Sequence, residues 1–264
     1  MQKKNTSILI TGHRGFIASN FIKFLRLRGI KYKIFNSSMF KNNNKGKFTH
    51  LFHFAFRKGL KKMTINKYIN DNVLMTKKLV QFSNKNNIQF IFPSTPAYFP
   101  NDKSHKENDF FYSYNLYSFT KILCENLITN EKNLNYIVFR IFNVYGNGGT
   151  SFLDNLKLKI IAKNKYKFNE NNWISRDFIS IEDLFNIFEI LVIKTIKKNT
   201  FNLACGKSYQ LGKIVNKIDK SKLIKFSNNV KFTPYRPVVK ADISKLIKSF
   251  KFTPNKNIYN YFSE

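Results

Sequence analysis

Tyr117 and Lys121 have the residue types and the spacing best suited to proton transfer in this chain of 264 residues. They open a segment in which Ile122, Leu123 and Leu127 recur at helical spacing, so we expect an amphipathic helix there. A spacing of four in a helix places the phenol and the ammonium on one face. Because a nearby ammonium favours the phenolate, such a pair can take or give a proton near neutral pH.

The spacing alone is not specific, since Tyr209 and Lys213 repeat it in the same chain. A third chemical group comes from Ser94, which follows an apolar strand expected over residues 88–92. Side chains at the carboxyl end of a parallel strand lie where open α/β sheets place their chemistry. A hydroxyl there could hold a substrate carbonyl or alcohol beside Tyr117. Taken by itself, however, Ser94 fits an ordinary proline-rich turn better.

A glycine-containing turn near the start of the chain is typical of dinucleotide binding. Ser7–Thr11 is a short apolar run that predicts a buried strand, and Gly12 and Gly15 follow it. Gly12 permits a tight turn, and Gly15 lets the backbone approach a pyrophosphate closely. A helix is expected to begin at Phe16 and Ile17, so its free N–H groups and positive dipole point at the turn.

The turn departs from the G-x-G-x-x-G pattern, because Ala18 stands where a third glycine would be. An ordinary strand–turn–helix remains an alternative interpretation of the turn alone, since short glycine motifs often match by accident. A P-loop is excluded because no Gly-Lys-Ser/Thr closes the turn.

The residues after the second expected strand, Lys31–Phe35, bear on the choice of cofactor. A carboxylate there would bind the adenosine ribose, but Asn36, Ser37 and Ser38 carry none. Arg14, inside the glycine turn, could face a 2′-phosphate. These residues tilt the expectation from NAD toward NADP, although an Arg14 that simply points to solvent fits the sequence as well.

Alternating apolar strands and helices through about residue 140 predict an α/β fold with a Rossmann-like, doubly wound, mostly parallel sheet. We expect residues 1–145 to form an NAD(P)-binding domain, to which part of 177–205 returns. Residues 146–264 alternate less regularly and are expected to form a smaller C-terminal substrate lobe.

The sequence contains no apolar run long enough to span a membrane, since Ile187–Ile193 is short and contains Glu189. We therefore expect no membrane partner, and without a signal peptide the chain is expected to be cytoplasmic. Cys124 and Cys205 form no metal or redox motif, and the four histidines show no ligand spacing, so no metal site is expected.

The formal net charge is +31, from 46 basic and 15 acidic residues. A basic surface can bind nucleic acid, yet the lysines are scattered among asparagines and not gathered on one helix. A nucleic-acid partner is therefore disfavoured, and the positive field would also attract an anionic small molecule.

Eight ordered segments of the chain together resemble the extended short-chain dehydrogenases/reductases, in the NAD-dependent epimerase/dehydratase group that acts on nucleotide sugars. These segments are the glycine turn Ile8–Ser19, His53-Phe54-Ala55, Asn72 with Thr76, Ser94–Tyr98, Tyr117 with Lys121, Arg140–Gly146, Arg176-Asp177-Phe178 followed by Phe201–Gly206, and Arg236 with Asp242 and Lys245.

The resemblance implies a role for each candidate residue. It implies that Tyr117 is the acid/base, that Lys121 tunes it and binds the cofactor, and that Ser94 binds the substrate. The cofactor-binding set that it implies is Gly12, Arg14, Gly15, Phe16, Ile17, Ser37, His53, Ala55, Asn72 and Lys121. Asn143, Arg176 and Arg236 would meet the diphosphate of the nucleotide, since an arginine fork suits phosphate oxygens.

Two departures from the family pattern narrow the expectation. Only about a dozen residues separate the second strand from Thr49–Phe54, which is too few for the further strand and helix that the family usually has there. Thr95 and Pro96 stand where dehydratases of the family carry an Asp-Glu pair, which argues against sugar dehydration. The Gly-His-Arg-Gly turn resembles the NADP-using GDP-fucose synthase branch, but the cysteine and histidine of that branch are not evident.

The function that we expect is a nucleotide-sugar epimerase that works through a 4-keto intermediate, with a nucleotide-diphosphate sugar as its small-molecule partner. Two alternatives stay open: an NADPH-dependent reductase of a 4-keto nucleotide sugar, and a non-catalytic nucleic-acid-binding member of the fold. A homodimer, through the helix that carries Tyr117 and its neighbour at 66–84, is compatible with the resemblance.

Overall fold

The computed structural model describes residues 6–42, 44–59, 63–96, 104–109, 113, 115–194, 196–227 and 238–263. The chain forms two compact units. Unit 1 comprises Met1–Tyr98, Tyr112–Arg140 and Ile187–Phe201, and unit 2 comprises Phe99–Phe111, Ile141–Asn186 and Asn202–Glu264. Unit 1 thus takes in Ile187–Phe201 from the later part of the chain, and unit 2 takes in Phe99–Phe111 from the earlier part. No helix in the described ranges could cross a bilayer.

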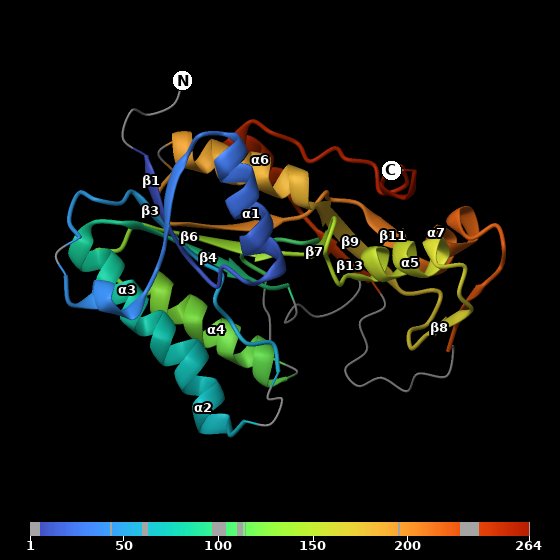
Figure 1. Cartoon of the computed structure of the whole chain (residues 1–264), viewed down its shortest axis with the longest axis horizontal. Helices are drawn as coiled ribbons and strands as arrows, with labels where there is room; N and C mark the ends of the chain where they lie inside the picture. The colour runs from blue at the N-terminus through green and yellow to red at the C-terminus, as the bar shows by residue number, and fades with distance from the viewer. Residues whose placement is uncertain are drawn as a thin grey trace. The chain divides into compact units, whose positions relative to one another are not determined.

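Unit 1 is built on a six-stranded sheet in the order β10-β6-β4-β3-β1-β2 (Figure 1). The strands are β1 (Ser7–Thr11), β2 (Lys31–Ile34), β3 (His50–His53), β4 (Gln89–Ser94), β6 (Tyr136–Ile141) and β10 (Asn199–Leu203). β1 pairs in parallel with β2 and β3, β3 with β4, and β4 with β6. The carboxyl ends of these strands therefore share one edge, and the Rossmann-like expectation is confirmed.

Helices cover both faces of this sheet (Figure 1). On one face lie α1 (Phe16–Leu27) and the part of α6 (Ile181–Ile193) that belongs to unit 1. An aromatic contact joins them across a strand: the ring of Phe21 lies 4.8 Å from that of Phe52 and 5.3 Å from that of Phe188. Such tilted and edge-on ring pairs contribute beyond their buried area.

The other face carries a nearly continuous helical segment and the helix of the predicted acid/base pair. The segment consists of α2 (Ile65–Ile69), the π-helical turn η2 (Asn70–Leu74) and α3 (Met75–Asn86), and beside it runs α4 (Leu116–Thr129). The apolar core between these helices and the sheet includes Leu51, Phe90, Phe92 and Cys124, all fully buried. Cys124 therefore packs as a small apolar side chain.

The link between β2 and β3 is as short as the sequence predicted. Among the described residues of this link, 35–42 and 44–49, a 3₁₀ turn, η1 (Ser37–Phe40), is the only helical element, and β2 ends the sheet order. The rings of Phe35, Phe40 and Phe82 pack against one another at 5.0 to 5.8 Å. This contact fixes the short link on α3 without a further strand.

A buried ion pair ties α4 to β6. Arg140 Nη2 lies 2.9 Å from Glu125 Oε2, and Arg140 Nε also donates to this carboxylate. Both side chains are almost fully buried. Removing one partner of such a pair leaves an uncompensated charge in a low-dielectric interior.

Unit 2 has a second sheet, in the order β11-β9-β13-β5 with β7 paired to β9. Its strands are β5 (Ser104–His105), β7 (Asn143–Tyr145), β9 (Ser175–Ser180), β11 (Ser208–Gln210) and β13 (Val238–Ala241). The short strands β8 (Tyr166–Phe168) and β12 (Ile224–Phe226) pair in parallel. The helices are α5 (Phe152–Ile161), α7 (Leu211–Ile218), α8 (Ser244–Phe250) and the 3₁₀ turn η3 (Asn260–Phe262).

We predict that Glu125→Gln lowers the free energy of unfolding by about 3 kcal/mol, because Arg140 keeps its charge and loses its partner. Urea denaturation measures the effect. The matched control is Glu189→Gln, which removes the more exposed pair with Arg28 and should cost less than about 1 kcal/mol. Equal losses in the two variants would contradict the prediction.

Candidate active site

The glycine turn after β1 depends on the close approach of two backbones. Gly12 has a φ of +69°, and a Cβ atom on it would lie 2.5 Å from the Ala55 nitrogen and 2.6 Å from the Phe54 carbonyl carbon. Only glycine fits that space. The Gly15 N–H donates to the Gly12 carbonyl at 2.9 Å, which closes the turn.

Helix α1 begins directly after this turn. Gly15 is its N-cap and offers no capping side chain, and the first turn of α1 carries no acidic residue. The N–H groups that begin with Phe16 and Ile17 therefore suit an anion. Arg14 is exposed in the same turn.

The residues directly after β2, where the sequence predicts that a ribose would lie, carry no carboxylate. Ser37 is exposed and opens η1, while the Ser38 hydroxyl donates to Asn36 Oδ1 at 2.5 Å. A ribose acceptor here would have to be a hydroxyl or an amide.

His53 lies inside the protein in a chain of hydrogen bonds. The Thr76 hydroxyl donates to the Asn72 carbonyl at 2.6 Å, so its oxygen must accept from His53 Nε2 at 3.0 Å. His53 Nδ1 then accepts from the Thr11 hydroxyl at 2.8 Å, and Thr11 Oγ1 accepts from the Ala55 N–H at 3.1 Å. Burial, and then the charge of Lys121, lower the pKa of His53 to about 3, so the ring is neutral.

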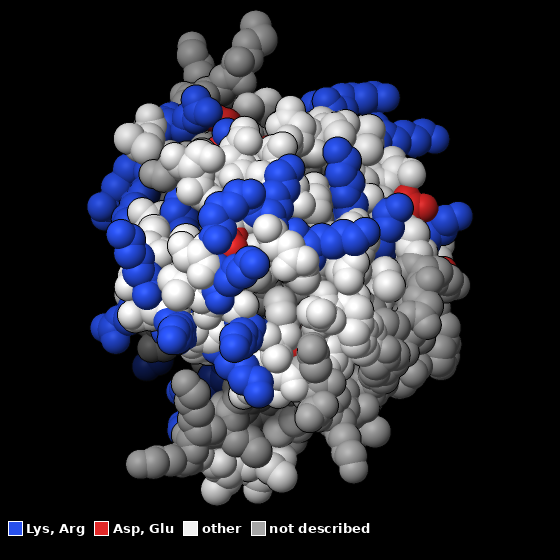
Figure 2. All heavy atoms as spheres, turned by 90° about the vertical axis from the view of Figure 1, so that its right-hand side faces the viewer, with Lys and Arg blue, Asp and Glu red and all other residues white. Residues whose placement is uncertain are grey.

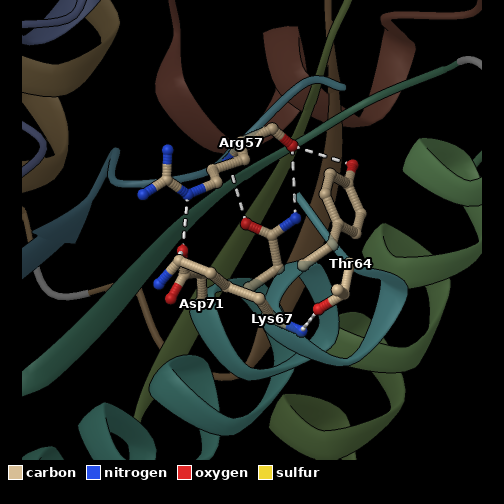
Figure 3. A network of polar contacts seen from close by, with 6 residues as sticks. Arg57, Thr64, Lys67 and Asp71 are labelled. Carbon is tan, nitrogen blue, oxygen red and sulfur yellow. Dashed lines mark hydrogen bonds and ion pairs between the residues drawn. The ribbon is translucent and has the colours of Figure 1, made fainter. Parts of the chain in front are cut away.

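Asn72 holds the loop that follows β3. Its Oδ1 accepts from the Arg57 N–H at 2.8 Å, and its Nδ2 donates to the Arg57 carbonyl, which the Tyr68 hydroxyl also contacts at 2.9 Å. The Arg57 guanidinium bonds Asp71 at 2.6 Å (Figure 3). His53 and Asn72 have no exposed surface. Their hydrogen bonds position the loop 54–57, and their expected contact with a cofactor stays a prediction.

Tyr117 and Lys121 lie on α4, which begins with a capping box between Asn115 and Ser118. The Lys121 ammonium donates to the Pro93 carbonyl at 2.5 Å. It also lies 3.7 Å from the ring centre of Phe56 and 4.3 Å from that of Phe92. These cation–π contacts partly replace the lost water. Burial nonetheless lowers the pKa of Lys121 to about 7.

The Tyr117 ring packs edge-on against Phe56, at 5.9 Å between ring centres. Burial raises the pKa of Tyr117 to about 12, while a hydrogen bond with the Thr95 side chain opposes that rise. The phenol is therefore protonated at neutral pH in this state.

Thr95 is a residue that the sequence reasoning missed as a partner of Tyr117. We expected the strand to end at residue 92 and chose Ser94 as the hydroxyl beside the phenol. In the structure β4 continues through Ser94, which pairs with Arg140, so the first residue beyond the strand is Thr95. The hydroxyl that contacts Tyr117 is therefore on the residue that follows the last β4–β6 pair, Ser94 with Arg140. The next residues, Pro96 and Ala97, are still not acids, so the argument against dehydration stands.

Two of the three predicted diphosphate contacts lie in unit 2. Asn143 is half-buried on β7 and its Nδ2 donates to the Asp177 carbonyl at 2.8 Å. Arg176 is half-buried on β9 and donates to the Ser175 carbonyl at 2.9 Å. Burial raises the pKa of Glu170, and the charge of Arg176 opposes that rise. Arg236 lies outside the described residues.

The second cysteine is a structural group. The Asp177 carboxylate accepts from the Cys205 backbone N–H and from its thiol, both at 3.2 Å, and burial raises the pKa of that thiol to about 12. Among the described residues, no cluster of His, Cys, Asp or Glu could hold a metal ion.

The chain matches the model of a family described as the NAD dependent epimerase/dehydratase family, over residues 8–204. A curated relative, the ADP-L-glycero-D-manno-heptose-6-epimerase of Brachyspira hyodysenteriae, is 25% identical over 289 residues, which cover 90% of this chain and 90% of the relative.

Two solved structures show the same fold. A UDP-N-acetylglucosamine 4-epimerase from Methanobrevibacter ruminantium is 21% identical with a TM-score of 0.79, covering 98% of this chain and 95% of its own. A UDP-glucuronic acid 4-epimerase from Bacillus cereus, in a complex with NAD, is 18% identical with a TM-score of 0.81, covering 98% and 99%.

The buried lysine predicts a pH dependence of stability. Because the pKa of Lys121 falls from 10.5 to about 7 on folding, only the unfolded chain holds that proton between these values. Stability from this group therefore rises with pH across that window. We expect the free energy of unfolding of the natural protein, relative to that of Lys121→Met, to rise by about 1 kcal/mol per pH unit between pH 7.5 and 9.5.

Urea denaturation at both pH values tests this prediction. Lys78→Met, which changes an exposed lysine on α3, serves as the control, and its difference from the natural protein should stay constant. A Lys121→Met difference that does not change with pH would contradict the prediction.

Proposed function

Because the chain belongs to the NAD-dependent epimerase/dehydratase family, we propose that it is a nucleotide-sugar epimerase with a bound nicotinamide cofactor. The observation that carries the proposal is the contact of Tyr117 with Thr95 at the carboxyl end of β4, with the buried Lys121 one helical turn along. That end of a parallel sheet is where this class of fold binds its ligands.

The residues of the glycine turn fit a dinucleotide. Gly12 and Gly15 have no side chains, so a pyrophosphate could approach the backbone of the turn closely. Helix α1 starts without an acidic residue or a capping side chain, so its first N–H groups would face that pyrophosphate. A nicotinamide held by this turn would supply the chemistry of accepting a hydride from the sugar carbon and returning it. Loop 54–57 links this turn to the chemistry, because Ala55 touches Gly12 and Phe56 touches Tyr117.

Tyr117 exchanges the proton at the C4 hydroxyl of the sugar. Its phenol must ionise to accept this proton, and positive charge beside it favours ionisation. Lys121, on the same face of α4, carries a positive charge below its lowered pKa of about 7 and would then supply such charge. Thr95 donates to the phenolate and orients it toward the substrate.

The nucleotide diphosphate is expected to meet Asn143, Arg176 and Arg236. The 4-keto sugar would then turn over and be reduced from its other face. A reductase of a 4-keto nucleotide sugar remains the second candidate, because no carboxylate follows β2 to favour a permanently bound NAD.

The first experiment incubates the pure protein with a panel of UDP-, GDP-, dTDP- and ADP-sugars, followed by NMR of the sugar protons. An epimerase converts one of them without added cofactor. Turnover that requires NADPH and consumes it stoichiometrically would support the reductase. No conversion under either condition would contradict both candidates.

We predict that Tyr117→Phe lowers the rate of this conversion by about 10²-fold to 10⁴-fold, since the proton-transferring group is lost. The matched control is Tyr209→Phe, which has the same spacing to a lysine but lies on β11 of unit 2. Equal rates for the natural protein and Tyr117→Phe would refute the role of Tyr117.

Arg14 provides a test of cofactor choice. If its guanidinium faces the 2′-phosphate, Arg14→Ala should weaken NADPH binding by about tenfold and leave NADH binding unchanged. Titration of the nicotinamide fluorescence measures both affinities. Equal weakening for both cofactors would mean that Arg14 does not read the 2′-phosphate.

A further inference from the structure

The outer surface of unit 2 around α5 and β12 carries a concentration of positive charge. Helices α5 and α7 and strands β8 and β12 share one apolar core, in which the ring of Phe152 lies 4.7 Å from that of Phe168 and 6.2 Å from that of Phe226. With the apolar side chains turned inward, the lysines of these elements face outward.

We define the lysine face as Lys159, Lys163, Lys165, Lys167, Lys222 and Lys225. The two segments that contain it, 155–168 and 220–227, hold eight lysines and no acidic residue. Figure 2 shows blue side chains across this end of the molecule with few red ones between them. The face is thus more one-sided in charge than the chain as a whole, which has 46 basic and 15 acidic residues.

The fold brings like charges together within this face. Strands β8 and β12 pair in parallel with Lys167 directly beside Lys225, and both side chains are exposed. Like charges directly opposite each other in a sheet are destabilising. An anionic partner would relieve this repulsion.

Exposed apolar side chains lie among these lysines. Leu158 is 60% exposed and Ile161 is 67% exposed, and their spacing of three places them on one side of α5. Tyr166 is also exposed, and the Lys159 ammonium lies 4.6 Å from its ring centre. Large aliphatic groups kept in water beside lysines are typical of a surface that lies on a bilayer.

We propose that the lysine face, with Leu158 and Ile161, docks unit 2 onto an anionic phospholipid membrane. The lysines meet the lipid phosphates, and the two aliphatic side chains insert between the headgroups. A single-stranded nucleic acid would also attract the lysines and could stack on Tyr166, but the exposed aliphatic side chains of Leu158 and Ile161 add little to such binding. This proposal departs from the expectation of no membrane partner, which rested on the lack of a segment that could span a bilayer.

Co-sedimentation with vesicles tests the proposal. The full-length protein should bind vesicles of phosphatidylglycerol and phosphatidylcholine in equal parts, and not vesicles of phosphatidylcholine alone. The double variant Lys163→Gln/Lys165→Gln should bind about tenfold more weakly. Leu158→Ser/Ile161→Ser should also bind about tenfold more weakly. Its remaining binding is electrostatic, so a lower concentration of added salt should abolish it than is needed for the natural protein.

Matched controls separate this surface from the overall charge. Lys77→Gln/Lys78→Gln removes two exposed lysines from α3 of unit 1, and Leu27→Ser removes a side chain of α1 that is 88% exposed. Both controls should bind as the natural protein does. All substituted positions are on the surface, and circular dichroism verifies that each variant folds.

Three results would overturn the proposal. The first is no binding to the anionic vesicles. The second is an equal loss in the control and test lysine pairs, which would mean that only net charge matters. The third is tighter binding to labelled oligouridine that depends on Lys163 and Lys165 but not on Leu158 and Ile161, which would assign the face to nucleic acid.

Discussion

The contact between Gly12 and the backbone of Phe54 and Ala55 holds the candidate site together. It leaves no room for a side chain on Gly12, so the turn after β1 and the loop after β3 must move as one. Because the same loop places Phe56 against both Tyr117 and Lys121, the glycine turn and this pair of side chains share one support. A shift of this loop would disturb both at once.

Buried hydrogen bonds fix that loop from beneath. The neutral ring of His53 joins Thr11 to Thr76, and the Asn72 amide bonds both the N–H and the carbonyl of Arg57. Each of these groups would cost free energy if it were buried without a partner. The residues of the His-x-Ala and Asn-x-x-x-Thr patterns thus build the framework beneath the loop in this chain.

The sequence could predict what depends on local pattern. The glycine turn, the parallel sheet, the short link after β2 and the helix with Tyr117 and Lys121 all follow from apolar periodicity and turn residues. Thr95 could not be chosen, because the ladder between β4 and β6 continues two residues beyond the apolar run. Phe56 was missed for a similar reason, since its contact with α4 depends on tertiary packing that no spacing reveals. The lysine face is also tertiary, because the pairing of β8 with β12 joins lysines that look scattered along the chain.

The short link between β2 and β3 also has a consequence for how copies of this protein meet. It leaves β2 at the rim of the sheet, where unpaired backbone groups could template the addition of a foreign strand. Lys31 and Lys33 both stand exposed along that rim. Two ammonium groups on so short an outer strand would have to lose water before another chain could pair there, so these lysines protect the edge of the sheet against aggregation.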